Sequence, residues 1–138
     1  MTVVAGIDES QASALVLAAA LEQARWRQTD VKVVHVLHMP PIYAEAAIDW
    51  QEVGEAERSA VWTGVEEALA DVEVDVEKVD LDGYPADTLV DYATDVDASL
   101  LVVGTRGRGE LASLVLGSTS HRAIQLAPCD VLVVKAAE

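Results

Sequence analysis

Short runs of β-branched apolar residues alternate with segments of helical periodicity along this chain, and the alternation limits the folds available to it. The apolar runs are typical of strands, and the segments between them carry apolar residues at three- and four-residue spacing, as amphipathic helices do. Such an alternation favours an α/β fold, a parallel sheet covered by helices. The five predicted strands are residues 2–7, 31–37, 74–81, 100–103 and 131–134.

The helices are predicted from apolar spacing and from the residues at their ends. Residues 8–10 read Asp-Glu-Ser, a natural helix start after the first strand. A second helix is expected over residues 53–72, a short one from Pro85, where proline fits the first turn, and a last one over residues 118–126. The residues of the first helix predicted to face the core are Ala14, Leu17, Ala18, Leu21 and Ala24.

Parallel strands joined through helices require right-handed crossovers, which restricts how five strands are arranged. The common solution is a doubly wound, Rossmann-like sheet of order 3-2-1-4-5 with helices on both faces. In that order strands one and four are neighbours, and the chain leaves them toward opposite sides. A ligand-binding crevice then opens beyond their carboxyl ends. Asp8 and Gly104 are expected on its two sides.

The strongly acidic charge excludes one class of function. The chain has 24 acidic against 9 basic residues and a formal net charge of −15. A nucleic-acid binder needs a basic face to neutralise phosphates, so no nucleic-acid partner is expected.

Apolar runs and cysteine content predict the compartment. The longest apolar runs are too short to cross a bilayer, so no membrane partner is expected, and no basic flank precedes an N-terminal apolar stretch as in a signal peptide. Cys129 is the single cysteine, so no disulfide framework is possible and a reducing cytoplasmic location is predicted. No repeat or linker divides the chain, and we expect residues 1–138 to form one domain.

The segment after the fourth predicted strand carries the chemistry. Residues 104–122 read GTRGRGELASLVLGSTSHR and hold four of the eight glycines, whose backbone can approach a ligand closely and expose N–H groups to an anion. Hydroxyl residues follow at the start of the last helix, where free N–H groups favour phosphate. The segment has a charge of +2, which leaves −17 on the remainder. Each feature alone also fits an ordinary turn or helix cap. Together, at the predicted crevice, they indicate an anionic ligand.

Two known phosphate-binding motifs do not fit this segment. Gly104 and Gly109 have the spacing of a P-loop, but Glu110 and Leu111 occupy the positions of its lysine and Ser/Thr. Residues 107–112 match a loose dinucleotide fingerprint, yet they follow the fourth strand and lack the acidic partner for the ribose.

The glycine spacing resembles that of a known family. Gly104, two residues, Gly107, nine residues, and then Gly117-Ser118 is similar to the nucleotide-binding signature of universal stress proteins. The resemblance covers nearly the whole chain, through VVAGIDES, VVHVL, GYPADTLVDYA, ASLLVVGTRGRG, LGSTSHRAI and APCDVLVV. Asp130 departs from it, because the family commonly has proline there.

The resemblance implies a 3-2-1-4-5 sheet in a dimeric stress protein of the ATP-binding branch. Asp8 is then the best candidate for a hydrogen bond to adenosine, and Val36 and Val103 are expected to pack on the base. A divalent ion such as Mg²⁺, if present, is expected on the phosphates of the nucleotide. The full set of expected nucleotide-binding residues is Gly6, Ile7, Asp8, Val36, Val103, Gly104, Arg106, Gly107, Arg108, Gly109, Gly117, Ser118, Thr119 and Ser120.

Three functions compete at this point. The leading one is a binding module whose ATP occupancy sets conformation or partner choice during stress, with little turnover. The second is a slow ATPase or phosphate-transferring protein that uses the same crevice, which the missing P-loop lysine disfavours. The third is a structural homodimer without nucleotide. Dimerisation is predicted through the last strand, an apolar edge of the sheet.

The histidines and the cysteine are interpreted as non-catalytic. His35 is predicted to be satisfied within the core, His121 to lie on a helix surface, and Cys129 to be a packed thiol. His38 begins an irregular stretch that could approach the crevice. Their spacing fits no metal site, and none is predicted.

Overall fold

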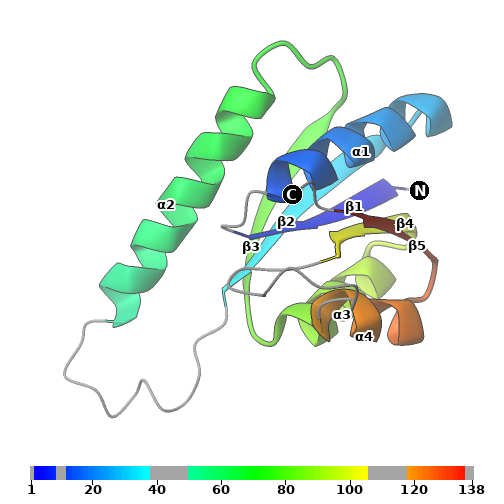
Figure 1. Cartoon of the computed structure of the whole chain (residues 1–138). Coiled ribbons are helices and arrows are strands. Elements are labelled where there is room, and N and C mark those ends of the chain that lie inside the picture. Colours follow the sequence, from blue (N-terminus) through cyan, green and yellow to red (C-terminus); the bar gives the residue numbers. More distant parts are fainter. Residues whose placement is uncertain (1, 9–11, 38–49, 106–117, 136–138) are drawn as a thin grey trace.

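The computed structural model describes residues 2–8, 12–37, 50–105 and 118–135, and for Trp50, Ser118 and Thr119 only the backbone. Five strands and four helices alternate along these residues, as the sequence predicts (Figure 1). The elements are β1 Thr2–Ile7, α1 Ala12–Arg27, β2 Asp30–Leu37, α2 Trp50–Ala68, β3 Val76–Asp82, α3 Pro85–Asp95, β4 Ala98–Gly104, α4 Ser118–Leu126 and β5 Asp130–Val134.

All five strands are parallel, and their order in the sheet is β3-β2-β1-β4-β5. β1 lies at the centre, where Val3 pairs with Val31 of β2 on one side and with Leu100 of β4 on the other. The predicted fold class is therefore confirmed: a doubly wound, Rossmann-like α/β sheet with order 3-2-1-4-5.

Helices cover both faces of the sheet (Figure 1). Side chains of α1 and α2 pack with one core cluster, which includes Val3, Ala5 and Val33 of the strands. Side chains of α3 and α4 pack with a second cluster on the other face, around Val34 and Leu101. The β-branched strand residues alternate between the two clusters, because successive side chains of a strand point to opposite faces.

The predicted core face of α1 is partly wrong. Leu17, Leu21 and Ala24 are buried as expected, but Ala14 and Ala18 are exposed. The helix is Ala-, Leu- and Val-rich on almost every side, so apolar spacing cannot distinguish one stripe from its neighbour. The buried stripe also includes Val16 and Ala20.

The ends of α2 and β3 also differ from the prediction. α2 begins three residues earlier than expected and ends at Ala68, and β3 is Val76–Asp82. Leu69 and Val72, predicted to continue the helix, instead follow it and pack against the core from outside the helix. None of the described helices is long and apolar enough to cross a membrane.

Candidate functional site

The carboxyl ends of β1 and β4 lie side by side, as the topology predicts. Ala5 pairs with Val102, and both strands run in the same direction for two more residues. Asp8 therefore follows β1 at the sheet edge where Gly104 ends β4. These are the two residues expected on either side of the ligand crevice, and the fold brings them to one edge.

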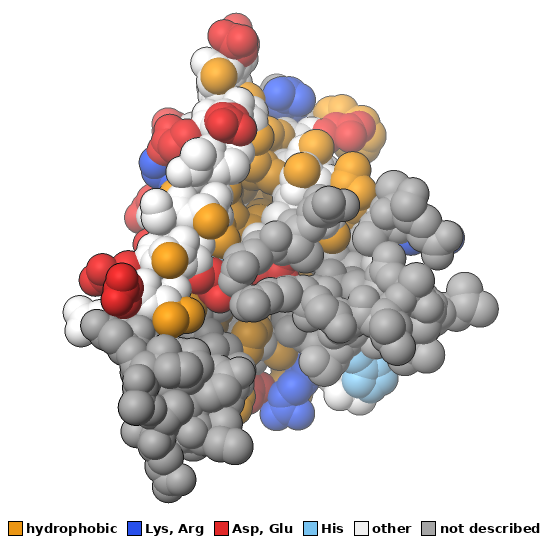
Figure 2. Space-filling view, turned by 60° about the vertical axis from the view of Figure 1, so that its left-hand side comes forward, with side chains coloured by type: hydrophobic (Ala, Val, Ile, Leu, Met, Phe, Trp, Pro, Cys, Tyr) orange, Lys and Arg blue, Asp and Glu red, His pale blue; other side chains and the backbone are white. Residues whose placement is uncertain are grey.

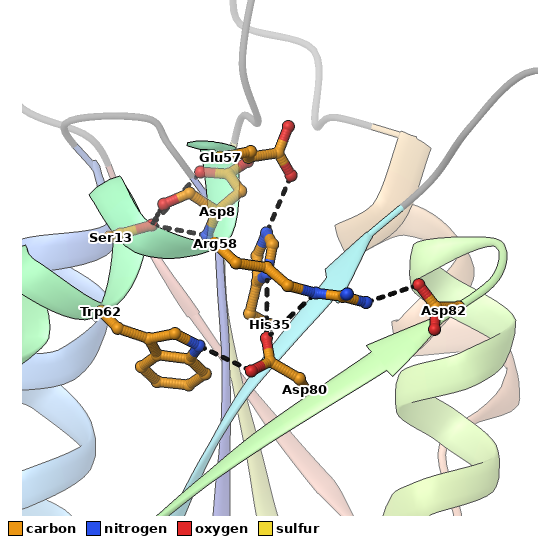
Figure 3. A network of polar contacts seen from close by, with 8 residues as sticks. All are labelled: Asp8, Ser13, His35, Glu57, Arg58, Trp62, Asp80 and Asp82. Atoms are coloured by element: carbon orange, nitrogen blue, oxygen red, sulfur yellow. Dashed lines mark hydrogen bonds and ion pairs between the residues drawn. The ribbon is translucent and has the colours of Figure 1, made fainter. Parts of the chain in front are cut away.

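Asp8 is held by the first turn of α1 (Figure 3). Its backbone N–H donates to Ser13 Oγ at 2.8 Å. The Ser13 hydroxyl lies 2.9 Å from the Asp8 carbonyl oxygen and 3.2 Å from Asp8 Oδ1, and both oxygens are acceptors. The half-buried carboxylate is thereby oriented at the strand end. Its expected hydrogen bond to adenosine stays a prediction.

Several predicted binding residues have a structural role. Val36 and Val103 are 8% and 2% exposed and belong to the core cluster beneath α3 and α4, and Ile7 is buried in the cluster beneath α1. A Cβ on Gly6 would lie 2.7 Å from Leu89 Cδ1, so any larger residue there would force the Leu89 side chain of α3 to shift. Contact of Val36 and Val103 with the base, and of Gly6 and Ile7 with the adenosine, stays a prediction.

The N-terminus of α4 is attached to the end of β4. Ser120 is 1% exposed, and its hydroxyl donates to the Thr105 carbonyl oxygen at 3.4 Å. The Thr105 N–H in turn donates to the Val134 carbonyl at 3.0 Å, which joins this corner to β5. α4 starts at Ser118, and the first backbone N–H groups of a helix, which have no partner within the helix, are a position that favours anions. The side chains of Ser118 and Thr119 are not described, and Arg106, Gly107, Arg108, Gly109 and Gly117 lie outside the described residues.

Part of the positive charge of residues 104–122 is paired with an acidic residue of the protein itself. Arg122 Nε lies 2.9 Å from Asp87 Oδ1 of α3. Both side chains are about half exposed, so the pair contributes little to stability. Its geometry nevertheless directs Arg122 to α3. The predicted attraction of an anion then rests mainly on Arg106 and Arg108, which lie outside the described residues.

A polar network between α2 and the sheet was missed by sequence reasoning (Figure 3). The His35 side chain of β2 is fully buried, with Nε2 2.9 Å from Glu57 Oε2 and Nδ1 3.4 Å from Asp80 Oδ1. Its ring makes an edge-to-face contact with Trp62, at 6.4 Å between centroids. The prediction that His35 is satisfied in the core is confirmed.

The same network extends along α2 and β3 as a row of three polar contacts between the helix and the strand. Every fourth residue of the helix meets every second residue of the strand, because four helical residues and two strand residues span similar lengths, roughly 6 Å. Arg58 Nη2 lies 2.5 Å from Asp82 Oδ1, and Trp62 Nε1 donates to Asp80 Oδ2 at 2.8 Å. Lys78 and Glu66 form the third contact, an ion pair. The sequence carries a partial signal, namely side chains with hydrogen-bond donors or acceptors at positions 58, 62 and 66, where residue 62 is tryptophan, and charged residues at the alternate positions 78, 80 and 82.

Cys129 and His121 fit the interpretations given above. Cys129 packs against the core cluster beneath α4; burial, and then the charge of Asp130, raise the pKa of its thiol, although Arg27 lowers it. A raised pKa disfavours the reactive thiolate. His121 is exposed on α4, and His38 lies outside the described residues. Within the described part of the chain, no group of three His, Cys, Asp or Glu side chains is arranged to hold a metal ion.

Comparison with known proteins agrees with the fold and the sequence signature. The model of the Universal stress protein family matches residues 1–135. Universal stress protein YxiE of Bacillus subtilis is 30% identical over 140 residues, which cover 94% of this chain and 95% of that protein. Universal stress protein Rv2623 of Mycobacterium tuberculosis is 34% identical over 139 residues, and the match spans 96% of this chain but only 44% of that relative.

Solved structures show the same architecture. Universal stress protein UspA from Lactobacillus plantarum superposes with a TM-score of 0.83 at 21% identity and 97% coverage of both chains. A universal stress protein in complex with cAMP gives 0.76 at 26% identity, covering 99% of this chain and 98% of that one. The Archaeoglobus fulgidus protein in complex with dAMP gives 0.75 at 25%, covering 98% of each. The family match over almost the whole chain and the B. subtilis relative show that this chain belongs to the universal stress protein family.

Proposed function

We propose that this chain binds ATP at the edge formed by the ends of β1 and β4 and acts as a regulatory binding module in a stress response, with little or no turnover. The observation that carries the proposal is the pair of similar structures that hold adenine nucleotides, cAMP in one and dAMP in the other. Both match this chain over nearly its full length, which supports an adenine-nucleotide site in this protein, and the sheet topology supports the edge formed by β1 and β4 as its location.

Three features favour a triphosphate over a monophosphate. The glycine spacing of residues 104–118 is that of the signature associated with ATP binding, and α4 begins at its last residue, so the signature ends at a helix N-terminus, which favours phosphate. Arg106 and Arg108 add positive charge to a chain that is otherwise acidic. Mg²⁺, where present, is expected on the phosphates. Hydrolysis is expected to be well below the roughly 10 per second of a median enzyme, because Glu110 replaces the P-loop lysine.

The first test is the identity of the bound ligand. Mass spectrometry of small molecules released from freshly purified protein is expected to detect ATP. Calorimetric titration of nucleotide-free protein is expected to give a dissociation constant for ATP at least about tenfold below that for cAMP, a difference of about 1.4 kcal/mol. Equal or tighter binding of cAMP would contradict the assignment of ATP, and no binding of either would contradict the adenine site.

We also infer a homodimer that pairs along β5. This strand lies at one edge of the sheet, and its residues Val131 to Val134 are only half-buried. On the adjoining α4, Ile124 and Leu126 are 49% and 46% exposed. An apolar edge strand beside exposed apolar side chains favours pairing with a second copy.

Ile124→Asp is expected to convert the dimer to a monomer, because it places a carboxylate of each copy at a 49% exposed apolar position of α4 beside the shared edge. Val53→Asp on α2 adds the same charge at a position 46% exposed and is the matched control. Sedimentation at micromolar concentration and moderate salt measures the oligomeric state of both variants and of the parent chain. A monomeric parent chain, or two variants that remain equally dimeric, would contradict the β5 interface.

A further inference from the structure

α2 is attached to the rest of the molecule by few apolar side chains. Among the side chains of α2 that the structure describes, Val61 and Val65 are the buried ones, although the helix has 19 residues, and Trp62 is half-buried against the same core cluster. α1 has 16 residues and buries five side chains, and α3 has 11 residues and buries four. Because the hydrophobic effect is roughly proportional to the apolar area removed from water, it contributes less per residue to the attachment of α2 than to that of α1 and α3.

Charged side chains make further contacts between α2 and the sheet. Arg58 Nη2 lies 2.5 Å from Asp82 Oδ1. Lys78 of β3 pairs with Glu66 of α2. The Asp82, Lys78 and Glu66 side chains are 75%, 42% and 58% exposed, and exposed ion pairs contribute little to stability. His35 gives α2 a buried polar contact, at 2.9 Å. The attachment of α2 to the sheet therefore depends strongly on charge.

α2 and the strand beside it carry charge of the same sign. α2 has five glutamates and one arginine, a charge of −4. Residues 69–82, which follow α2 and include β3, have six acidic residues and one lysine, a charge of −5. Figure 2 shows acidic side chains distributed along the side of the molecule that α2 forms. Outside the polar contacts named above, the two elements therefore repel each other.

Salt acts unequally on this attraction and this repulsion. The ion pair between Arg58 and Asp82 is short and the contact to His35 is buried, so salt weakens both less than it weakens repulsion over longer distances. The remaining charges of α2 are spread over a helix roughly 28 Å long, at a rise of about 1.5 Å per residue. The Debye length is about 30 Å at 0.01 M ionic strength and about 8 Å at 0.15 M. The repulsion therefore acts along the entire helix in dilute salt and is largely screened at physiological ionic strength.

We propose that α2 is an ionic-strength-sensitive element of this protein, which opens from the sheet as a separate unit and does so less often as the salt concentration rises. Opening exposes Val61 and Val65 together with strand residues of the core cluster beneath them, among them Val31 and Val33. The open form thus presents an apolar surface that the closed form buries. The inference concerns the attachment of α2 and does not rest on nucleotide binding.

Hydrogen exchange of the full chain, measured by mass spectrometry, tests the separate opening. Peptides of α2 and of α3 are compared at about 0.01 M and about 0.3 M sodium chloride, which lie on either side of physiological screening. In dilute salt the amides of α2 are expected to exchange at least about tenfold faster than those of α3, because each amide reports the opening of its own unit. The difference is expected to fall at least about threefold in the higher salt, where the repulsion is screened. Equal exchange of the two helices in dilute salt, or a difference that salt does not reduce, would overturn the proposal.

Removing charge from α2 tests the cause of the opening. Glu55→Gln combined with Glu67→Gln removes two exposed charges that take no part in the contacts described above, and glutamine is about as good a helix former as glutamate. This double variant is expected to slow the exchange of the α2 amides in dilute salt at least about threefold, because less repulsion remains to be screened.

Asp91→Asn combined with Asp95→Asn is the matched control, at exposed positions of α3 on the other face of the sheet. It changes the net charge of the chain by the same amount, and α2 is expected to exchange within about twofold of its rate in the parent chain, because the charge removed does not lie on α2. Circular dichroism verifies that both double variants are folded. If the two have the same effect on α2, its opening does not depend on its own charge, and the proposal is wrong.

Discussion

His35→Ala is expected to lower the free energy of unfolding by about 2 to 4 kcal/mol, because the substitution removes a fully buried ring and both of its polar contacts. The ring lies between Glu57 of α2 and Asp80 of β3, at 2.9 Å and 3.4 Å from their carboxylate oxygens. Without it, the Glu57 and Asp80 carboxylates lose their contacts to the ring nitrogens, although Trp62 still donates to Asp80, and the edge-to-face contact between His35 and Trp62 is lost as well.

Urea unfolding followed by far-UV circular dichroism measures this change. Lys32→Ala is the control on the same strand: its ammonium lies 2.7 Å from Glu77, and that hydrogen bond raises the pKa of Lys32, so the pair is formed at neutral pH. Glu77 is 61% exposed, and a pair of this kind contributes less than about 1 kcal/mol. If His35→Ala costs no more than Lys32→Ala, the buried network does not hold α2 to the sheet as we describe.

The sheet could be predicted because each strand carries its own local signal. β1 and α4 begin and end at the predicted residues, since a β-branched run defines the strand and hydroxyl residues define the helix start. The right-handed crossover rule then determines how such strands are ordered. Apolar spacing does not identify the buried face of a helix that is apolar on almost every side. In α1 it therefore assigned Ala14 and Ala18 to the core, although both are exposed.

The position of α2 could not be predicted, because it depends on long side chains that meet across space. The glutamates of α2 gave no indication that Glu57 would reach a buried histidine 22 residues earlier in the chain. The alternation in β3 predicted a strand but not the partners of its polar face, Asp80 and Asp82. Such contacts require the distance between helix and sheet, which sequence spacing does not contain.

The candidate site was predictable in its location and less so in its side chains. The topology alone brings Asp8 and Gly104 to one edge. Val36 and Val103 are predicted to pack on the base, and the structure shows in addition that both are buried in the core cluster, which the prediction did not include. Ser120 joins α4 to Thr105, a contact between residues fifteen positions apart that no short motif reveals.

Gly117→Val is expected to lower the affinity for ATP at least about tenfold, or about 1.4 kcal/mol. Gly117 comes directly before Ser118, where α4 begins, so it precedes the N–H groups proposed to bind phosphate. Valine adds a branched Cβ where the backbone is expected to approach the ligand, and it restricts φ. The fold is expected to survive, because the contacts that attach α4 to β4, between Ser120 and Thr105, do not involve this side chain.

Ser118→Ala is the matched comparison and is expected to weaken ATP binding less than Gly117→Val, because the backbone N–H groups of the helix remain when the hydroxyl is removed. Calorimetric titration with ATP measures both variants, and circular dichroism verifies that both are folded. Two results would contradict the phosphate site: a folded Gly117→Val protein that binds ATP as tightly as the parent, or a larger loss in Ser118→Ala. The second result would assign the phosphate contact to the side chain of residue 118 rather than to the backbone of the helix start.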